Sequence, residues 1–210
     1  MRNYENEREL TRALLDFLEK SPTSFHAVEQ MEARLRKEGF EELREEESWK
    51  LEEGGKYYVI RSMSSLIAFR IPGTDFGGYQ IMASHGDSPA FKIKENPEIL
   101  VENQYVKLNT EGYGGMLCAP WLDRPLSVAG RIAIKEKGKI VTRLVNIDRD
   151  LLMIPNLAIH MNREANNGYQ YNPQKDLLPL FGEAAAKGTF QKILAEAAGV
   201  KEEEILGHDL

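Results

Sequence analysis

Cysteine is almost missing from this sequence, because Cys118 is the single thiol among 210 residues. One cysteine cannot form a disulfide within the chain, so a disulfide-stabilised scaffold is excluded and a reducing compartment is predicted. A catalytic role for Cys118 is the less favoured interpretation, since most lone cysteines pack as small apolar residues.

Long apolar runs and clusters of basic residues are also missing. No stretch reaches the roughly 20 apolar residues of a membrane span, and the N-terminus, MRNYENERELTR, has no apolar core of a signal peptide. The net charge is −6 and no basic stripe is visible, so neither nucleic acid nor membrane is an expected partner. A cytoplasmic protein of one or two domains is the default prediction.

The first part of the chain has helix patterns followed by strand patterns. Apolar side chains recur at helical spacing over residues 5–19, and a second helix is predicted from Thr23 or Ser24 to about Gly39. Strands are predicted at 57–61, 65–71 and 79–84, the last one apolar and buried.

After Pro89 the sequence becomes rich in strand patterns. One strand is predicted at 99–108, and a hairpin is predicted from 130–134 and 139–145. Pro155 interrupts the apolar run 151–159, which is interpreted as an edge strand or an irregular segment. Residues 162–173 are predicted to form a loop, and residues 189–198 a last helix that ends at Gly199.

A possible metal site follows the predicted strand 79–84, in the sequence ASHGDSP of residues 83–89. Alternate side chains of an extended segment share one face, so His85 and Asp87 are expected on the same side. A neutral imidazole is a good zinc ligand, and a nearby carboxylate can fix its tautomer and orientation. Spacing alone favours a simpler interpretation, in which the two residues are hydrogen-bonded at a turn.

The same segment contains Ser84 and Ser88, which suggests a serine hydrolase as a further alternative. This alternative is disfavoured, because the nucleophile and base usually come from distant parts of a chain and no Gly-x-Ser-x-Gly elbow is present.

The sequence resembles the aspartyl aminopeptidase family of metallopeptidases, M18, from about residue 10 to its end. The motif ASHGDSP, followed by Lys92 and Lys94, carries this resemblance, together with the earlier segment SPTSFHAV at 21–28. Further matching motifs follow in order: YGG at 113–115, WLDR at 121–124, AGR at 129–131, LV at 144–145, IP at 154–155, LAIH at 157–160 and GHDL at 207–210.

The resemblance implies an α/β fold: an incomplete catalytic domain of the zinc-exopeptidase kind with an inserted, β-rich dimerisation domain. It implies that residues 1–90 are the first part of the catalytic domain and residues 91–210 most of the inserted one. The implied activity is hydrolysis of peptides by a two-zinc aminopeptidase that removes N-terminal residues, acidic ones in many members.

The resemblance also assigns roles to single residues. His85 matches the first histidine ligand of zinc, and Asp87 matches the catalytic-site aspartate that supports the metal site. His160 matches a substrate-binding histidine that reaches the active site of the partner subunit, which implies a homo-oligomer. His26 and His208 are expected to be structural.

The other metal ligands of the family have no counterpart in these 210 residues. The chain is therefore expected to be an N-terminal fragment that lacks a complete two-zinc site and is inactive alone, because zinc usually takes about four ligands. The alternative is a non-catalytic module that has kept the dimerisation domain as an interaction surface.

Overall fold

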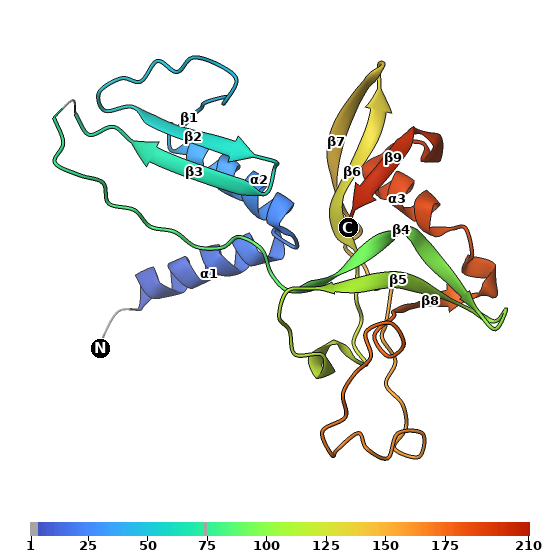
Figure 1. Ribbon diagram of the computed structural model, residues 1–210. Coiled ribbons are helices and arrows are strands. Elements are labelled where there is room, and N and C mark those ends of the chain that lie inside the picture. The colour runs from blue at the N-terminus through green and yellow to red at the C-terminus, as the bar shows by residue number, and fades with distance from the viewer. Residues whose placement is uncertain (1–3, 74) are drawn as a thin grey trace. The chain divides into compact units, whose positions relative to one another are not determined.

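The computed structural model describes residues 4–73 and 75–210 and contains both helices and sheets. The chain divides into two compact units, unit 1 up to Ser88 and unit 2 from Pro89 to Leu210 (Figure 1). No helix in the described part of the chain is long and apolar enough to span a bilayer.

Unit 1 has two helices followed by a small sheet. The helices are α1 (Glu5–Glu19) and α2 (Ser24–Lys37), and the strands, in the order β1-β2-β3, are β1 (Glu41–Glu42), β2 (Lys56–Arg61) and β3 (Ser65–Arg70). Both predicted helices and the first two predicted strands of this region are confirmed. The side chain of Thr23 accepts a hydrogen bond from the backbone N–H of His26, so a side-chain cap begins α2 as the sequence predicts.

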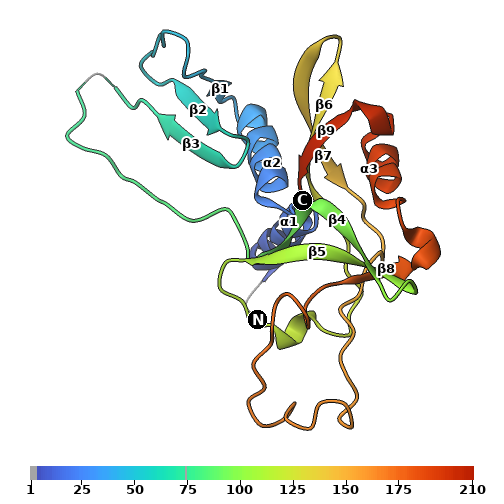
Figure 2. The same cartoon turned by 45° about the vertical axis from the view of Figure 1, so that its right-hand side comes forward.

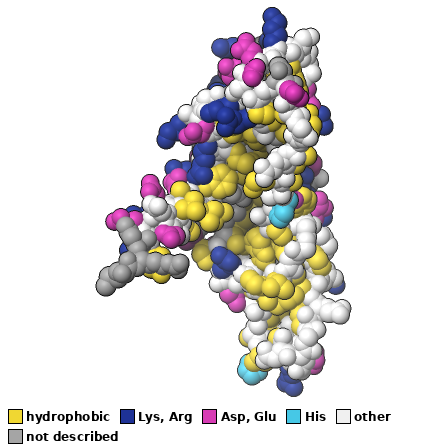
Figure 3. Space-filling model, turned by 90° about the vertical axis from the view of Figure 1, so that its left-hand side faces the viewer, with side chains coloured by type: hydrophobic (Ala, Val, Ile, Leu, Met, Phe, Trp, Pro, Cys, Tyr) yellow, Lys and Arg dark blue, Asp and Glu magenta, His cyan; other side chains and the backbone are white. Residues whose placement is uncertain are grey.

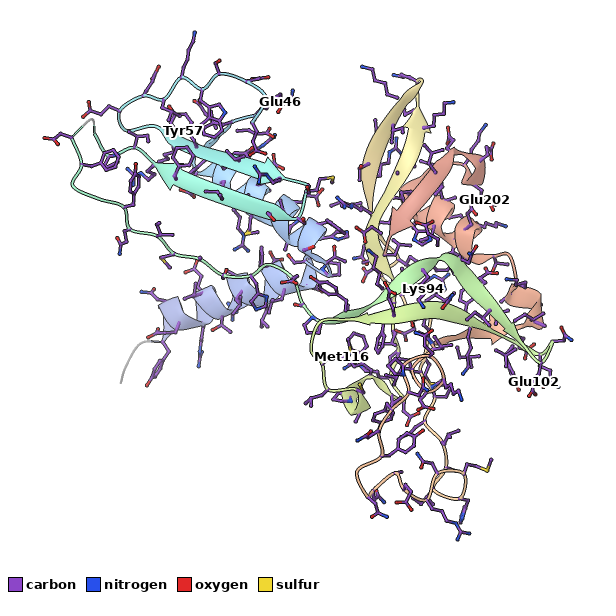
Figure 4. The ribbon with its side chains drawn as sticks, in the orientation of Figure 1. Glu46, Tyr57, Lys94, Glu102, Met116 and Glu202 are labelled. Atoms are coloured by element: carbon purple, nitrogen blue, oxygen red, sulfur yellow. The ribbon has the colours of Figure 1, made fainter. Side chains whose placement is uncertain are left out.

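Tyr58 on β2 joins this sheet to α2. Its side chain is fully buried, and its hydroxyl donates to Glu32 over 3.0 Å and accepts from Nε of Arg36 over 2.8 Å. A buried hydroxyl needs such partners, so the pattern fixes the position of α2 over the sheet. Tyr57, labelled in Figure 4, packs its ring 5.7 Å from that of Phe69 on β3.

Helix α1 is held less firmly. None of its side chains is buried, and its contact with α2 runs through Arg34, which lies 4.9 Å over the ring of Phe17 and donates to the carbonyl of Ala13. Four leucines of α1 remain more than half exposed, namely Leu10, Leu14, Leu15 and Leu18.

Unit 2 is built mainly from strands. Its strands are β4 (Ala90–Val101), β5 (Tyr105–Tyr113), β6 (Ala129–Glu136), β7 (Lys139–Asn146), β8 (Leu180–Glu183) and β9 (Ile205–Asp209). They form two sheets in the orders β4-β5-β8 and β7-β6-β9. The helices are α3 (Phe190–Ala198) and the short 3₁₀ turns η1 (Ala119–Trp121), η2 (Ala184–Ala186) and η3 (Glu202–Glu204).

The predicted hairpin is confirmed in β6 and β7, which pair from Ala129 with Asn146 to Glu136 with Lys139. Its two-residue turn places Lys137 and Gly138 at positive φ, the conformation that tight hairpin turns require. The predicted strand 99–108 is wrong, because a turn divides it. Glu102 and Asn103 both have positive φ, and Glu102 lies at the tip where β4 returns as β5 (Figure 4).

The core of unit 2 lies between its sheets and α3. It contains Ile93, Leu108, Val128, Ile132, Ile134, Val145, Leu152, Phe190 and Leu194. The N–H of Ile93 donates to the carbonyl of Leu210, which ties β4 to the end of β9. In the same unit, the Trp121 ring packs edge-on against that of Phe91, with 5.0 Å between centroids.

The predicted last helix is α3, and Gly199 ends it in the left-handed conformation. At its other end, the Glu98 carboxylate accepts the N–H of Gly188 over 2.5 Å and that of Phe190 over 2.9 Å. Glu98 follows directly on a shift in the register of β4 against β5, which lies between Ile93 and Glu98.

Residues 151–159, predicted as an edge strand or an irregular segment, and residues 162–173, predicted as a loop, are largely irregular and belong to one long loop (Figure 2). Isolated β-bridges join the start of this loop to other segments of unit 2, pairing Leu152 with Leu126 and Met153 with Leu180.

Candidate functional site

The segment that leads to His85 is not the buried strand that the sequence predicts. Residues 79–84 have no regular structure, and Tyr79, Ile81 and Met82 are 83%, 82% and 94% exposed. A strand needs a neighbour for its backbone N–H and C=O groups. No backbone hydrogen bond joins this segment to another in the described residues, and β3 remains a sheet edge.

His85 and Asp87 nevertheless lie together beyond this segment. Nδ1 of His85 is 3.0 Å from Oδ1 of Asp87 and 3.0 Å from the Asp87 carbonyl oxygen. The imidazole side chain is 82% exposed and the carboxylate 44% exposed. This geometry agrees with the hydrogen-bonded pair predicted from spacing. It agrees equally with a metal-binding histidine whose ring is oriented by a carboxylate.

The pair can provide one ligand to a metal. A histidine that donates Nδ1–H to an oxygen presents its Nε2 lone pair outward, which is the usual arrangement behind a zinc-bound imidazole. The other ligands are lacking, since no group of three His, Cys, Asp or Glu side chains that could hold a metal occurs in the described chain. The residues therefore fit one position of a zinc site and do not complete it.

The serine-hydrolase alternative gains no support from the geometry. Ser84 and Ser88 are exposed, and Nδ1 of His85 is engaged by Asp87 instead of by either hydroxyl. Cys118 is a half-buried free thiol that precedes η1.

His160 belongs to unit 2 and is exposed, in a turn that follows the irregular segment 151–158. The side chains around it include the exposed Leu157, Ile159 and Met161. This position leaves the ring accessible to a molecule outside the unit.

The two remaining histidines are buried to a larger extent. Nδ1 of His26 lies 2.8 Å from the Thr23 hydroxyl at the start of α2, and burial lowers the pKa of this ring below its ordinary value. Burial also lowers the pKa of His208 on β9. Its Nδ1 is buried without a hydrogen-bond partner among the described residues.

A charged cluster beside His208 was not predicted from the sequence. Asp209 lies 2.9 Å from Nζ of Lys92 and 3.2 Å from a guanidinium nitrogen of Arg131. Burial raises the pKa of Asp209, but the two cations outweigh it and hold this pKa below its ordinary value. The three residues are far apart in sequence, so only the pairing of β6 with β9 brings Arg131 to Asp209.

Comparisons with known proteins give the family. The model of a family described as aminopeptidase I zinc metalloprotease (M18) matches residues 17–210. A probable M18 family aminopeptidase 2 from Clostridium acetobutylicum is 45% identical over 98% of this chain and 49% of the relative. One from Pseudomonas aeruginosa is 45% identical over 84% of the chain and 42% of the relative. The chain thus spans about half the length of the curated relatives it matches.

Solved structures agree with this result. The chain is similar to Chaetomium thermophilum mApe1, with a TM-score of 0.85 and 30% identity over 96% of this chain and 49% of that one. It is also similar to an S. cerevisiae mApe1 dodecamer, with a TM-score of 0.75 and 25% identity over 98% of this chain and 48% of that one. The chain belongs to the M18 family of aminopeptidase I zinc metalloproteases.

Proposed function

We propose that this chain contributes the His85–Asp87 part of a zinc aminopeptidase that removes N-terminal residues, acidic ones in particular, from peptides. The observation that carries the proposal is the 3.0 Å contact between Nδ1 of His85 and Oδ1 of Asp87, in a chain of the M18 family. In this proposal His85 binds the metal and Asp87 supports it, and the contact between them supports both roles.

In this proposal the carboxylate of Asp87 holds the imidazole in one tautomer and keeps Nε2 directed away from the chain. Bound zinc supplies a Lewis acid that polarises the scissile carbonyl and activates water. Gly86 has no atom within 4 Å of the place where a Cβ would lie, so the backbone between the two residues leaves room for a peptide.

His160 is proposed to bind substrate in a neighbouring subunit of a homo-oligomer. Its exposure in a turn of unit 2 supports this role, and the S. cerevisiae relative described as a dodecamer supports assembly. Residues 1–90 would then be the first part of the catalytic domain and residues 91–210 the inserted dimerisation domain.

A non-catalytic interaction module is the second candidate. The observation that favours it is the incomplete ligand set, since the described residues offer no group of three metal-binding side chains. Under this candidate unit 2 would associate with other copies while His85 binds no metal.

Two measurements test the proposal. In the first, zinc is added to the dialysed chain while the imidazole nitrogens are followed by NMR. We expect weak, substoichiometric binding that shifts Nε2 of His85 and is about 10- to 100-fold weaker in Asp87→Asn, because the supporting carboxylate is lost. The buried His26 and His208 are the internal controls. Two tightly held zinc ions per chain, or titration unchanged in His85→Asn, would contradict the proposal.

The second measurement places these 210 residues in a complete enzyme. The chain replaces the matching part of the C. acetobutylicum relative in one continuous polypeptide, which is assayed with zinc on peptides beginning with Asp, Glu, Leu or Lys. We expect hydrolysis that is fastest for Asp and Glu and at least 1,000-fold slower in His85→Asn. A folded chimera that hydrolyses none of the peptides would support the non-catalytic candidate.

A further inference from the structure

The motif WLDR at residues 121–124 has no role in the proposed function, yet it lies beside the segment that leads to His160. Leu122 forms an isolated parallel β-bridge with Ile154, whose side chain is fully buried. The backbone N–H of Asp123 donates to the carbonyl of Ile154 over 2.9 Å. The motif therefore contacts the long loop at the point where the loop leaves the buried part of unit 2.

The carboxylate of Asp123 makes the next contact along this loop. Its Oδ1 accepts the backbone N–H of Asn156 over 2.8 Å, and Oδ1 of Asn156 accepts the N–H of Leu157 over 2.8 Å. Pro155 precedes these two residues, and its ring fixes its own φ. Three consecutive residues after Ile154 thus have either a fixed φ or a bonded N–H, which leaves this limb of the loop few alternative conformations.

The turn that carries His160 follows directly. The carbonyl of Ala158 accepts the N–H of Met161 over 2.8 Å and that of Asn162 over 3.2 Å. His160 lies inside this turn with its side chain exposed, and Figure 3 shows histidine side chains at the surface of the face that it presents. The turn sets the direction of the His160 ring, and residues 154–157 set the direction of the turn.

Asp123 is itself held on a sheet of unit 2. It follows η1, in which the ring of Trp121 packs edge-on against that of Phe91 on β4. The φ of Asp123 is +54°, in the left-handed region, which aspartate tolerates better than most side chains. An aspartate at this position therefore combines a left-handed backbone with an acceptor short enough to reach the neighbouring chain.

Different contacts hold the returning limb of the loop, beyond His160. Asp176 accepts the hydroxyl of Tyr169 over 2.8 Å and the N–H of Asn172 over 2.7 Å. Gln174 donates to the carbonyl of Thr110 on β5 over 3.4 Å. Because these contacts do not involve Asp123, a change at Asp123 should act on residues 154–162 and leave the returning limb in place.

We propose that Asp123 is a positioning residue for His160. Its carboxylate and its backbone N–H fix residues 154–157, so that the turn at 158–162 presents the imidazole to a peptide in one direction. The carboxylate of Asp123 itself does not touch the peptide. The effect on peptide binding rests on the proposed function of His160, whereas the effect on the loop is measured without any peptide.

The first measurement uses the full 210-residue chain and NMR. Asp123→Gly removes the carboxylate and keeps the left-handed backbone, which glycine adopts without strain. We expect amide hydrogen exchange at Asn156 to become about fivefold faster or more, because its N–H loses its acceptor. The backbone order parameter of His160 should fall, and exchange at Asn172 should stay unchanged.

Asp148→Gly is the matched control for the first measurement. Asp148 is also an exposed aspartate of unit 2 with a left-handed backbone, at a φ of +47°. This variant should leave exchange at Asn156 and the order parameter of His160 unchanged. Wild-type values of either quantity in Asp123→Gly, or equal changes in both variants, would overturn the proposal.

The second measurement distinguishes positioning from a general loss of stability. In the chimera with the C. acetobutylicum relative, Asp123→Gly should lower kcat/KM about tenfold, divided between KM and kcat as in His160→Ala. The double variant should be no worse than His160→Ala alone, because Asp123 acts only through this ring. Asp123→Asn keeps a side-chain oxygen and should restore most of the activity. Additive losses in the double variant would overturn the proposal.

The two measurements also separate this inference from the proposed function. An inactive chimera, or one in which His160→Ala changes neither KM nor kcat, contradicts the proposed function, and the NMR result on the chain still decides whether Asp123 positions the turn. A loop that is unchanged in Asp123→Gly overturns the inference, while a chimera that loses activity in His160→Ala keeps the function.

Discussion

At the scale of single residues, the close approach of two strands depends on Gly130 in β6. A Cβ at this position would lie 2.2 Å from the carbonyl oxygen of Asp209 and 2.8 Å from Cα of Leu210. Both are backbone atoms of β9 and the residue that follows it, so they cannot rotate away as a flexible side chain would. Any larger residue must therefore push β9 away from β6.

We expect Gly130→Ala to lower the free energy of unfolding of unit 2 by about 1–3 kcal/mol, the usual cost of overpacking. Gly207→Ala is the control, because a Cβ there would meet no atom within 4 Å, and it should be neutral or slightly stabilising. Thermal melts followed by circular dichroism compare the two variants. Equal melting temperatures would show that β9 can shift without cost.

At the scale of elements, the N-terminus of α3 depends on a carboxylate from a different strand. Glu98 on β4 accepts the N–H groups of Gly188 and Phe190, and Nζ of Lys187 lies 3.5 Å from the same side chain, which is 8% exposed. The cap Thr189 makes no side-chain hydrogen bond of this kind. Glu98 thus supplies from a distance the acceptor that an N-cap residue normally provides.

Glu98→Ala should destabilise unit 2, because the N–H groups of Gly188 and Phe190 lose their acceptor. Each lost charge-assisted hydrogen bond should lower the free energy of unfolding by no more than about 1.5–3 kcal/mol. Amide hydrogen exchange at both residues should become faster by tenfold or more. Glu111→Ala, at an exposed position of β5, is the matched control and should leave exchange in α3 unchanged. A Glu98→Ala protein with wild-type exchange at Phe190 would contradict this role of the carboxylate.

The elements that could be predicted from the sequence are those whose stabilising contacts are local. Four of these signals act within a few residues of the chain. They are the apolar spacing along α1, the side-chain cap at Thr23, the hairpin turn at Lys137 and Gly138, and the end of α3 at Gly199. The contact between His85 and Asp87 was predicted for the same reason, since only Gly86 separates them.

Long-range contacts account for two of the predictions that failed, and an overlooked local signal accounts for a third. The turn at Glu102 and Asn103 lies in the polar run ENQ between two apolar stretches, without the glycine or proline that marks most turns. The β9 strand was missed because its pattern is short and its partner β6 lies about 75 residues earlier in the chain. Residues 79–84 have the apolar pattern of a buried strand, but no strand in the described part of the chain pairs with them.

At the scale of the whole molecule, unit 2 is expected to associate with other copies of itself. Its loop exposes Leu157, Ile159 and Met161, at 56%, 47% and 76%, beside His160, which the proposed function places in a neighbouring subunit. Contiguous exposed apolar side chains of this kind mark association surfaces in many proteins.

We expect light scattering to give a mass above that of the 23.9 kDa chain at high protein concentration. Leu157→Asp should weaken this association at least tenfold, because it places a charge in the apolar part of the contact. Ile67→Asp, at a side chain of β3 that is 69% exposed in unit 1, should not. A monomer at every concentration would contradict assembly through unit 2.

The two tryptophans give each unit its own optical probe. Trp49 in unit 1 is 44% exposed and donates its indole N–H to the Arg44 carbonyl, whereas Trp121 in unit 2 stacks edge-on against Phe91. The more solvated indole emits at longer wavelength, so fluorescence at the red edge reports unit 1 and fluorescence at the blue edge reports unit 2. Single-tryptophan versions of the protein can therefore follow the unfolding of each unit separately in the intact chain.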